Sequence, residues 1–418
     1  MKRTLLTYCF FIFTFYANSQ HCDVFHENMK SQTIFSSIDL SLNSSAITNQ
    51  FIDSYINGKF ITQKLKNRNY DRMSKNNVFG FNNDFKAAYF FKPVNSLFSI
   101  SNLGLFFTIE NHDLIEIKFR KELFNLMFNG NSQFAGKSVD LNDMLYRQLN
   151  YQQFKFGLFK SVNWFPGESI IGASIAINKG QKELTARIDE ASLYTHQYGE
   201  SLNLNLKMDV NRTDTNHTKL LAFNGIGTSI DFFYLYDNLN GDKLLFEMEN
   251  FGFIRWNKNS NSFAKDSAYS FEGWPIDNIL NVRDDEFDNF KSDTLVSEFA
   301  FDKVSKPYSS FLPMQIKFSY TKKIITEKLS ITASVKEIFF SAFKPYYTLK
   351  PNYNFHPKLG ISALVTYGGY GGFNSGIEVN IQDIKGFTLC VGSNFINSYL
   401  YPENYSGQGG YLRLYKTF

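Results

Sequence analysis

The sequence predicts an all-β fold, a transmembrane antiparallel β-barrel of about 14 strands, within a range of roughly 12 to 18. Segments of about ten residues alternate strictly between apolar and polar side chains. Aromatic side chains gather near the ends of these segments, and the chain stops on Phe418 inside one of them. A soluble β-sandwich gives the same alternation, but its strands are usually nearer 5 or 6 residues, whereas a tilted strand that crosses a bilayer needs about 9 to 11.

The composition agrees with a sheet that has one apolar and one polar face. The 418 residues include 46 phenylalanines, yet the mean hydropathy is −0.26. Apolar bulk must therefore be interleaved with polar residues. After the first 19 residues, no segment reaches the roughly 18 consecutive apolar residues of a membrane-spanning helix. The formal net charge of +4 favours no particular partner, and we expect no nucleic acid to bind.

The first 19 residues have the pattern of a secretory signal peptide. Lys2 and Arg3 precede an apolar stretch at 5–16, and Ala17-Asn18-Ser19 forms a small-residue cleavage site. We therefore expect export and a location in the cell outer membrane. The exported chain keeps two cysteines, Cys22 and Cys390, which either form one disulfide or remain separate thiols.

Residues 20–83 show no clean strand, and a short helix is expected after Ser44-Ser45. Two interpretations of this segment stay open: a plug inside the barrel, or a periplasmic segment packed against its rim. The barrel is expected to span 84–418, with inserted loops at 120–148 and 275–310. A second helix is expected at 122–128, inside the first insertion.

The expected strands alternate with period two and are bounded by turn residues. Leu202, Leu204 and Leu206, for example, alternate with Asn203, Asn205 and Lys207. Turns are expected at 179–181, 238–241 and 383–386. The expected strands are 85–91, 103–109, 154–159, 171–177, 183–189, 201–210, 225–236, 244–253, 312–320, 329–336, 345–355, 361–367, 373–382, 387–393 and 411–418.

The insertion at 275–310 is long and charged. Counting strands back from a periplasmic C-terminus places this loop outside the cell, where it is a candidate partner surface or simply a solvated loop. The spacing of a calcium loop is absent, and no cofactor or metal is expected. Its charged residues are Arg283, Asp284, Asp285, Glu286 and Asp288.

The last strand is a candidate signal for the barrel-assembly machinery. Leu412 and Leu414 are in phase with the terminal Phe418, a pattern that resembles the signal of bacterial outer-membrane barrels. Lys416 interrupts that phase at one position.

Four stretches resemble a large family of outer-membrane β-barrel proteins of the Bacteroidota lineage that is known only as a domain of unknown function. They are 122–131 with Phe134-Ala-Gly136, Asn150-Tyr-Gln-Gln-Phe-Lys-Phe-Gly157, Phe251-Gly-Phe-Ile-Arg-Trp256 and Phe311-Leu-Pro-Met314. The resemblance implies an architecture similar to long-chain fatty-acid transporters and to barrels of the type IX secretion system. It implies no agreed biochemical role and supplies no catalytic or binding residues.

These observations favour a non-enzymatic barrel, embedded in outer-membrane lipid, that passes or captures a small solute, including an apolar one. A first alternative is a scaffold or partner of a surface or secretion assembly of the type IX kind. A second is a lipid-modifying membrane enzyme. The histidines at 112, 196, 217 and 356 are expected in loops or turns, with no nucleophile motif nearby, so no catalytic residue is predicted.

Overall fold

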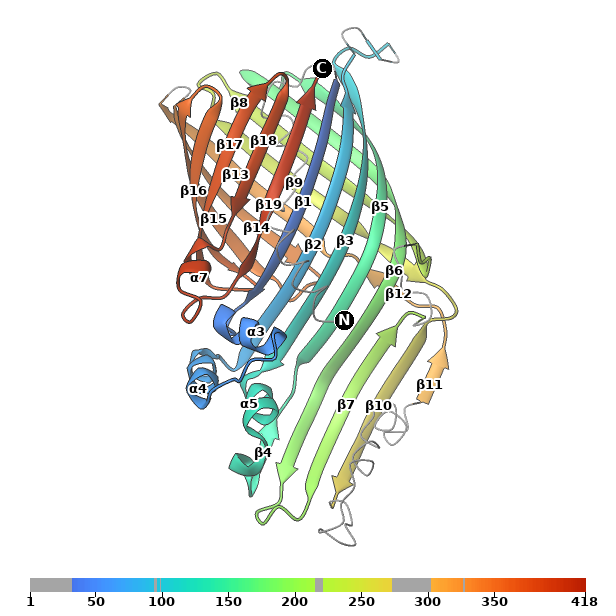
Figure 1. Cartoon of the computed structure of the whole chain (residues 1–418). Helices are drawn as coiled ribbons and strands as arrows, with labels where there is room; N and C mark the ends of the chain where they lie inside the picture. Colours follow the sequence, from blue (N-terminus) through green and yellow to red (C-terminus); the bar gives the residue numbers. More distant parts are fainter. Residues whose placement is uncertain (1–31, 94–95, 98, 215–220, 273–301, 326–327) are drawn as a thin grey trace, which may run out of the picture.

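The computed structural model describes residues 32–93, 96–97, 99–214, 221–272, 302–325 and 328–418. Within these ranges, 14 antiparallel strands close into a barrel, and a smaller sheet with several short helices continues it at one end (Figure 1). The barrel closes where β1 (Gln32–Ser44) pairs with β19 (Gln408–Thr417), in register from Thr33 opposite Thr417 to Leu42 opposite Gln408. The predicted transmembrane barrel is confirmed.

The other barrel strands follow one another round the wall in chain order. They are β2 (Asn76–Phe91), β3 (Leu103–Arg120), β5 (Met144–Val162), β6 (Gly167–Thr195), β8 (Gly225–Asn238), β9 (Lys243–Trp256), β13 (Met314–Ile325), β14 (Leu329–Phe339), β15 (Lys344–His356), β16 (Leu359–Gly369), β17 (Phe373–Ile384) and β18 (Phe387–Ser393).

The two ends of the barrel differ in their connections. Gln32 and Phe418 lie at one end, which also carries most of the tight hairpin turns, and we call it the short-turn end. The predicted turns at 238–241 and 383–386 are confirmed there, with Gly241 and Gly386 at positive φ. The opposite end, which we call the loop end, carries the helices and the longer connections (Figure 1).

Strand β6 corrects one predicted turn. Residues 179–181 do not reverse the chain, because β6 runs unbroken for 29 residues. At about 3.3 Å per residue this strand is about 95 Å long, far beyond what a bilayer requires. A Cβ atom on Gly180 would lie 2.5 Å from the Trp256 ring, so this glycine makes room for an indole and does not form a turn. Gln181 is the extra residue of a bulge opposite Asn150 and Tyr151.

Beyond the loop end, β6 continues into what we call the extension sheet. Its second half pairs with β7 (Leu202–Arg212) and with β4 (Lys137–Asp140). Strand β7 pairs with β10 (Asn261–Phe271), and β10 with β11 (Asp302–Ser305). The strand predicted at 201–210 therefore exists, but it lies outside the barrel. The predicted loop at 275–310 also contains β11 and β12 (Ser309–Phe311), and β12 pairs with β9.

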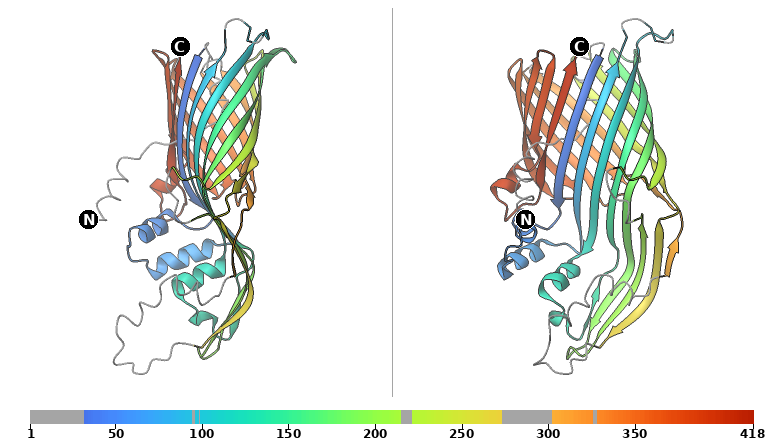
Figure 2. Two further views of the ribbon diagram at one scale, coloured as in Figure 1. Left: turned by 90° about the vertical axis from the view of Figure 1, so that its right-hand side faces the viewer. Right: turned by 45° about the vertical axis from the view of Figure 1, so that its right-hand side comes forward.

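Short helices lie on one side of the extension sheet (Figure 2). They are α3 (Asn49–Ile56), α4 (Gln63–Arg72) and α5 (Lys121–Asn129), followed by the 3-10 turn η1 (Ser132–Phe134); α7 (Ile396–Leu400) precedes β19. Phe51, Leu65 and Phe124 bury their side chains between α3, α4 and α5. The helices predicted after Ser44-Ser45 and at 122–128 are thus present. No helix among the described residues is long and apolar enough to cross a membrane.

The N-terminal boundary of the barrel lies further upstream than the sequence suggested. Residues 32–44 form β1, a barrel strand paired on both sides. The alternation of apolar and polar residues is hard to recognise in β1, because apolar residues occupy both of its faces. Phe35 points into the lumen and is fully buried, while Ile34 points outward and is 46% exposed. The helices of 45–75 connect β1 to β2 at the loop end, where Arg68 pairs with Glu403 at 2.8 Å. They are neither a plug nor part of the short-turn end.

Candidate functional site in the barrel lumen

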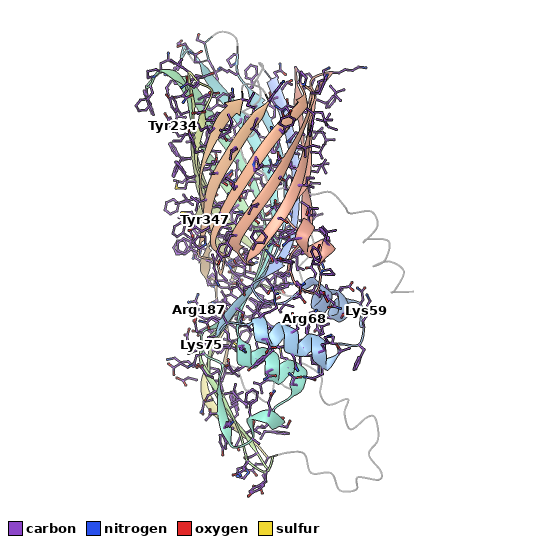
Figure 3. The ribbon with its side chains drawn as sticks, turned by 90° about the vertical axis from the view of Figure 1, so that its left-hand side faces the viewer. Lys59, Arg68, Lys75, Arg187, Tyr234 and Tyr347 are labelled. Atoms are coloured by element: carbon purple, nitrogen blue, oxygen red, sulfur yellow. The ribbon has the colours of Figure 1, made fainter. Side chains whose placement is uncertain are left out.

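The two faces of the barrel wall have opposite character. On β5 the outward Phe154, Phe156 and Leu158 are 40 to 54% exposed, while the inward Gln153 and Lys155 are fully buried. Outward apolar side chains face lipid in a membrane barrel, and inward polar ones face the lumen. Tyr234 and Tyr347 mark the outer wall at two heights, and the labelled basic side chains lie beyond the barrel (Figure 3).

At the short-turn end, the half of the lumen lined by β1 to β9 is filled by an aromatic cluster. Phe106 lies opposite Gly157, and Phe159 lies opposite Gly104. A Cβ atom on either glycine would approach the facing ring to 2.1 Å, so each ring occupies the space left by a missing side chain. The cluster comprises Phe35, Ala88, Phe90, Phe106, Phe159, Ile170, Phe233, Leu235, Leu245 and Tyr415.

Next to this cluster lies a buried network of charged side chains. Lys155 places its Nζ 2.9 Å from Glu110 and 2.8 Å from Asp231. Lys86 lies 3.0 Å from Glu110 and 3.6 Å from Glu249. Each lysine therefore lies between two carboxylates, and Glu110 is shared by both lysines. Buried charges require such partners.

His112 belongs to the same network. The sequence predicted a loop at this residue, but His112 lies within strand β3. Its Nδ1 lies 2.6 Å from Asp84, and its Nε2 lies 3.1 Å from Glu110 and 2.9 Å from Gln153. The imidazole stacks on Tyr151 with ring centroids 4.6 Å apart. These ring-nitrogen partners are carboxylates and an amide, so the arrangement orients the ring and presents no hydroxyl or thiol nucleophile to it.

At the loop end, chain segments from opposite walls meet across the lumen. The buried Glu116 of β3 accepts hydrogen bonds from the Ser341 hydroxyl, the Ala342 amide and the Tyr370 hydroxyl. Arg147 of β5 donates to the carbonyls of Phe340 at 2.6 Å and Phe311 at 2.8 Å. We call 311–313, 340–343 and Tyr370, docked on Glu116 and Arg147, the loop-end closure.

An apolar layer supports this closure. Leu312 and Trp256 pack in one cluster with Tyr370. The Trp256 indole donates to Ser310 at 2.9 Å, and Ser310 in turn donates to Glu183 at 2.9 Å. Burial raises the pKa of the Glu183 carboxyl above its usual range, although nearby Arg147 opposes that shift. The closure therefore combines an apolar seal with buried polar anchors.

The half of the lumen lined by β13 to β19 is open. A cavity of about 350 Å³ runs along these strands and reaches Gly241 and Lys323 at the short-turn end. A smaller cavity of about 100 Å³ lies between the charge network and the loop-end closure. Lys336 lines both cavities, so they meet at this side chain.

The structure brings few of the sequence-predicted site residues together. Leu412 and Leu414 point outward on β19, and the ring of Phe418 is 57% exposed at the short-turn end. The charged Lys416, which interrupts this apolar pattern, places its Nζ 4.1 Å from the Phe387 ring centroid at the rim. Recognition of this strand by assembly machinery stays a prediction.

Cys390 is buried on the lumen side of β18, while Cys22 lies outside the described residues, so their pairing stays open. The five charged residues of the predicted partner loop, Arg283, Asp284, Asp285, Glu286 and Asp288, also lie outside the described residues. Within the described ranges, no group of three or more histidine, cysteine or acidic side chains is placed to hold a metal ion.

The lumen residues were missed because sequence reasoning looked for catalytic motifs and not for the inward positions of each strand. The alternation itself could have identified them. Once the outward face of β13 is assigned to Ile316 and Phe318, the inward set must include Lys317 and Ser319. The same step on β15 selects Lys350.

Several solved structures are similar in architecture at very low identity. The translocator domain of autotransporter NalP from Neisseria meningitidis is 8% identical with a TM-score of 0.37, covering 95% of this chain and 91% of that one. The toluene transporter TodX of P. putida is 6% identical with a TM-score of 0.44, covering 94% and 91%. A Pseudomonas aeruginosa FadL homologue is 7% identical with a TM-score of 0.42, covering 93% and 90%. We draw no functional argument from these similarities.

No curated protein sequence matches the chain. A family profile does match, over residues 28–394, which includes all four stretches that carried the resemblance. The chain therefore belongs to the family of unknown function DUF5723.

Proposed function

We propose that the protein is a non-enzymatic outer-membrane barrel that passes or captures a small solute through its lumen. The observation that carries this proposal is the pair of cavities that meet at Lys336 and end at the loop-end closure. In barrels of this kind, short turns face the periplasm and long loops face outside. On that basis the larger cavity opens toward the periplasm, and the closure faces the exterior.

The lining favours a polar solute over the apolar one allowed by the sequence. Serine, threonine and asparagine side chains such as Ser334, Thr348 and Asn352 line the larger cavity. An apolar molecule there would leave these groups and their charged neighbours without hydrogen-bond partners, which costs free energy. The lumen is therefore better matched to a hydrated or hydrogen-bonding cargo.

The loop-end closure is the expected barrier to passage. Its residues 340–343 and Tyr370 lie in connections between strands, so they can move without breaking the barrel wall. Its polar contacts converge on Glu116 and Arg147, and loss of those contacts should let the smaller cavity open outward.

Single-channel recording in planar bilayers tests this proposal. We expect the full mature chain to open rarely, and a Ser341→Ala, Tyr370→Phe variant to open more often, because two donors to Glu116 are lost. Ser375→Ala, on β17 away from the closure, is the control. If the Ser341→Ala, Tyr370→Phe variant opens no more often than the full mature chain, and liposomes containing either protein accumulate no small polar solute, the passage proposal fails.

A scaffold role is the second candidate, and the extension sheet favours it. Strand β6 continues well beyond the length needed for a bilayer, and β7, β10 and β11 add a sheet that ends in a strand edge. Strand edges can pair with another chain. A stable partner that co-purifies with the full chain, and is lost when β7 and β10 are each replaced by a short loop that leaves the barrel strands β8 and β9 intact, would favour this role.

A further inference from the structure

The larger cavity has an unusual charge composition. Among the described residues that line it are six cations and one carboxylate, Glu378. The remaining polar lining consists mainly of hydroxyl and amide groups. The cations are Lys243, Lys317, Lys323, Lys336, Lys350 and Arg413.

These cations come from different strands and share one face. Lys317 and Lys323 lie on inward positions of β13, Lys336 on β14 and Lys350 on β15, while β19 contributes Arg413. Period two alternation places them in the lumen together with the polar residues next to them. The cluster is therefore built by the barrel wall, and no loop is needed to form it.

Glu378 is the one carboxylate among the described lining residues, and further carboxylates lie behind the lining, where Asp39 interacts electrostatically with Lys336 and Arg413. Glu378 lies 3.3 Å from Lys350 and 3.9 Å from Arg413, so one carboxylate faces two cations. Lys317 lies 3.9 Å from Glu247, and at the rim Lys243 lies 3.5 Å from Asp237.

Lys336 is the cation between the two cavities. It lies over two aromatic rings, with its Nζ 5.1 Å from the Phe343 centroid and 5.6 Å from the Tyr346 centroid. Like charges gathered in a low-dielectric space repel, and an anion placed among them relieves that repulsion.

We infer that this cavity binds a small hydroxylated organic anion, with a phosphate or carboxylate group among the cations and hydroxyl groups on the serine, threonine and asparagine lining. The inference rests on the proposed function, because it names the class of solute that the lumen takes. Its volume of about 350 Å³ falls within the usual range of small-molecule sites. Lys336 then offers the anion its next contact toward the smaller cavity.

Titration calorimetry of the full mature chain in zwitterionic detergent at low salt tests the inference. Glucose 6-phosphate, glucose and glucosamine share one skeleton and differ in charge. We expect saturable binding of glucose 6-phosphate at least about tenfold tighter than that of either sugar, since hydrogen bonds to charged groups are the stronger ones. Weakening of this binding by salt is also expected. Equal binding of the three probes, or no binding of glucose 6-phosphate, would overturn the inference.

A matched pair of variants locates the site. Lys323→Gln with Lys336→Gln should weaken glucose 6-phosphate binding about tenfold or more. Lys322→Gln changes the neighbouring side chain, which is exposed and absent from the cavity lining, and should leave the affinity unchanged. Heat-modifiable gel migration checks that every variant forms a barrel. Unchanged affinity in a folded double variant contradicts the assignment.

A competition experiment distinguishes a site for a free solute from a site for a lipid headgroup. Short-chain phosphatidylglycerol, added as monomers, is expected not to displace glucose 6-phosphate if the anion is a soluble one, and to displace it if the phosphate belongs to a lipid. Either result supports an anion site and decides its source. The inference and the proposed function fail separately. Anion binding without passage refutes transport alone, and passage of neutral sugars without anion preference refutes the anion site alone.

Discussion

The two halves of the lumen are lined by strands with the same alternation, yet one is filled and the other is open. In the half lined by β1 to β9, Lys155 lies between Glu110 and Asp231 and is completely buried. In the half lined by β13 to β19, Glu378, the one carboxylate among the described residues of the cavity lining, faces both Lys350 and Arg413, beside a cavity of about 350 Å³. This difference predicts that the first half stabilises the barrel, and it supports the proposal that the second half receives the solute.

Side-chain size produces the difference in volume. The filled half uses phenylalanine rings inserted over glycines, as with Phe106 over Gly157. The open half uses short residues at the same inward positions, including Ser319, Thr332 and Thr348. Close packing leaves no void larger than a water molecule, whereas short side chains on a curved wall leave one.

The largest effect is expected from Lys155→Met. Removing this ammonium leaves Glu110 and Asp231 buried with a missing partner, which typically costs about 3 to 5 kcal/mol. The midpoint of urea unfolding in liposomes should fall accordingly. Lys160→Met, at an exposed position on the same strand, is the control. An equal midpoint for both variants would mean that the network does not stabilise the filled half.

A smaller loss is expected from Gly157→Ala. The added Cβ would lie 2.1 Å from the Phe106 ring, which the surrounding cluster holds in place, and such overpacking costs about 1 to 3 kcal/mol. Gly372→Ala has open space at its Cβ position and should leave the unfolding midpoint nearly unchanged. A similar midpoint for both would show that the aromatic cluster can rearrange.

Glu378→Gln, in the open half, is expected to strengthen anion binding, whereas the two variants above are expected to lose stability. Without the carboxylate, Lys350 and Arg413 lose their neutralising partner, so glucose 6-phosphate should bind about tenfold more tightly. Glu337→Gln on β14, an outward position, should leave the affinity unchanged. Weaker binding in a folded Glu378→Gln barrel would indicate that Glu378 orients the cations and does not compete with the ligand.

The smallest effect concerns pH and lies outside the membrane-spanning wall. Because burial raises the pKa of Glu183, its protonated form is favoured in the folded state. The associated stability is present below the usual carboxyl range and is lost as the pH rises through the raised folded pKa. Glu183→Gln should therefore flatten the decline in stability as the pH rises above the usual carboxyl range, measured as the midpoint temperature of the heat-modifiable gel migration. Glu190→Gln, an exposed residue of the same strand, should keep the slope of the unmodified chain.

Period two explains which parts of the fold could be predicted. It identified most barrel strands, such as β8 and β17, because their outward residues are mostly apolar. It failed where a large apolar residue points inward, as Phe35 does in β1. It also misread Gly180 as a turn residue, since a glycine that makes room for the Trp256 ring looks the same in sequence as one with positive φ.

The candidate site could be predicted only in part. The inward lysines follow from the alternation, but the balance of charge around them does not. Lys155 and Lys350 both occupy inward positions of their strands. Lys155 lies between two carboxylates, whereas Lys350 shares the single carboxylate of Glu378 with Arg413. Which carboxylate reaches which lysine depends on strand register and on contacts across the lumen.

Local alternation and strand length were enough to predict the barrel, its approximate strand number and the polarity of its two faces. Three features required the folded structure: the continuation of β6 into the extension sheet, the loop-end closure held by Glu116 and Arg147, and the open half of the lumen. These features depend on contacts between residues far apart in the chain, which no local pattern records.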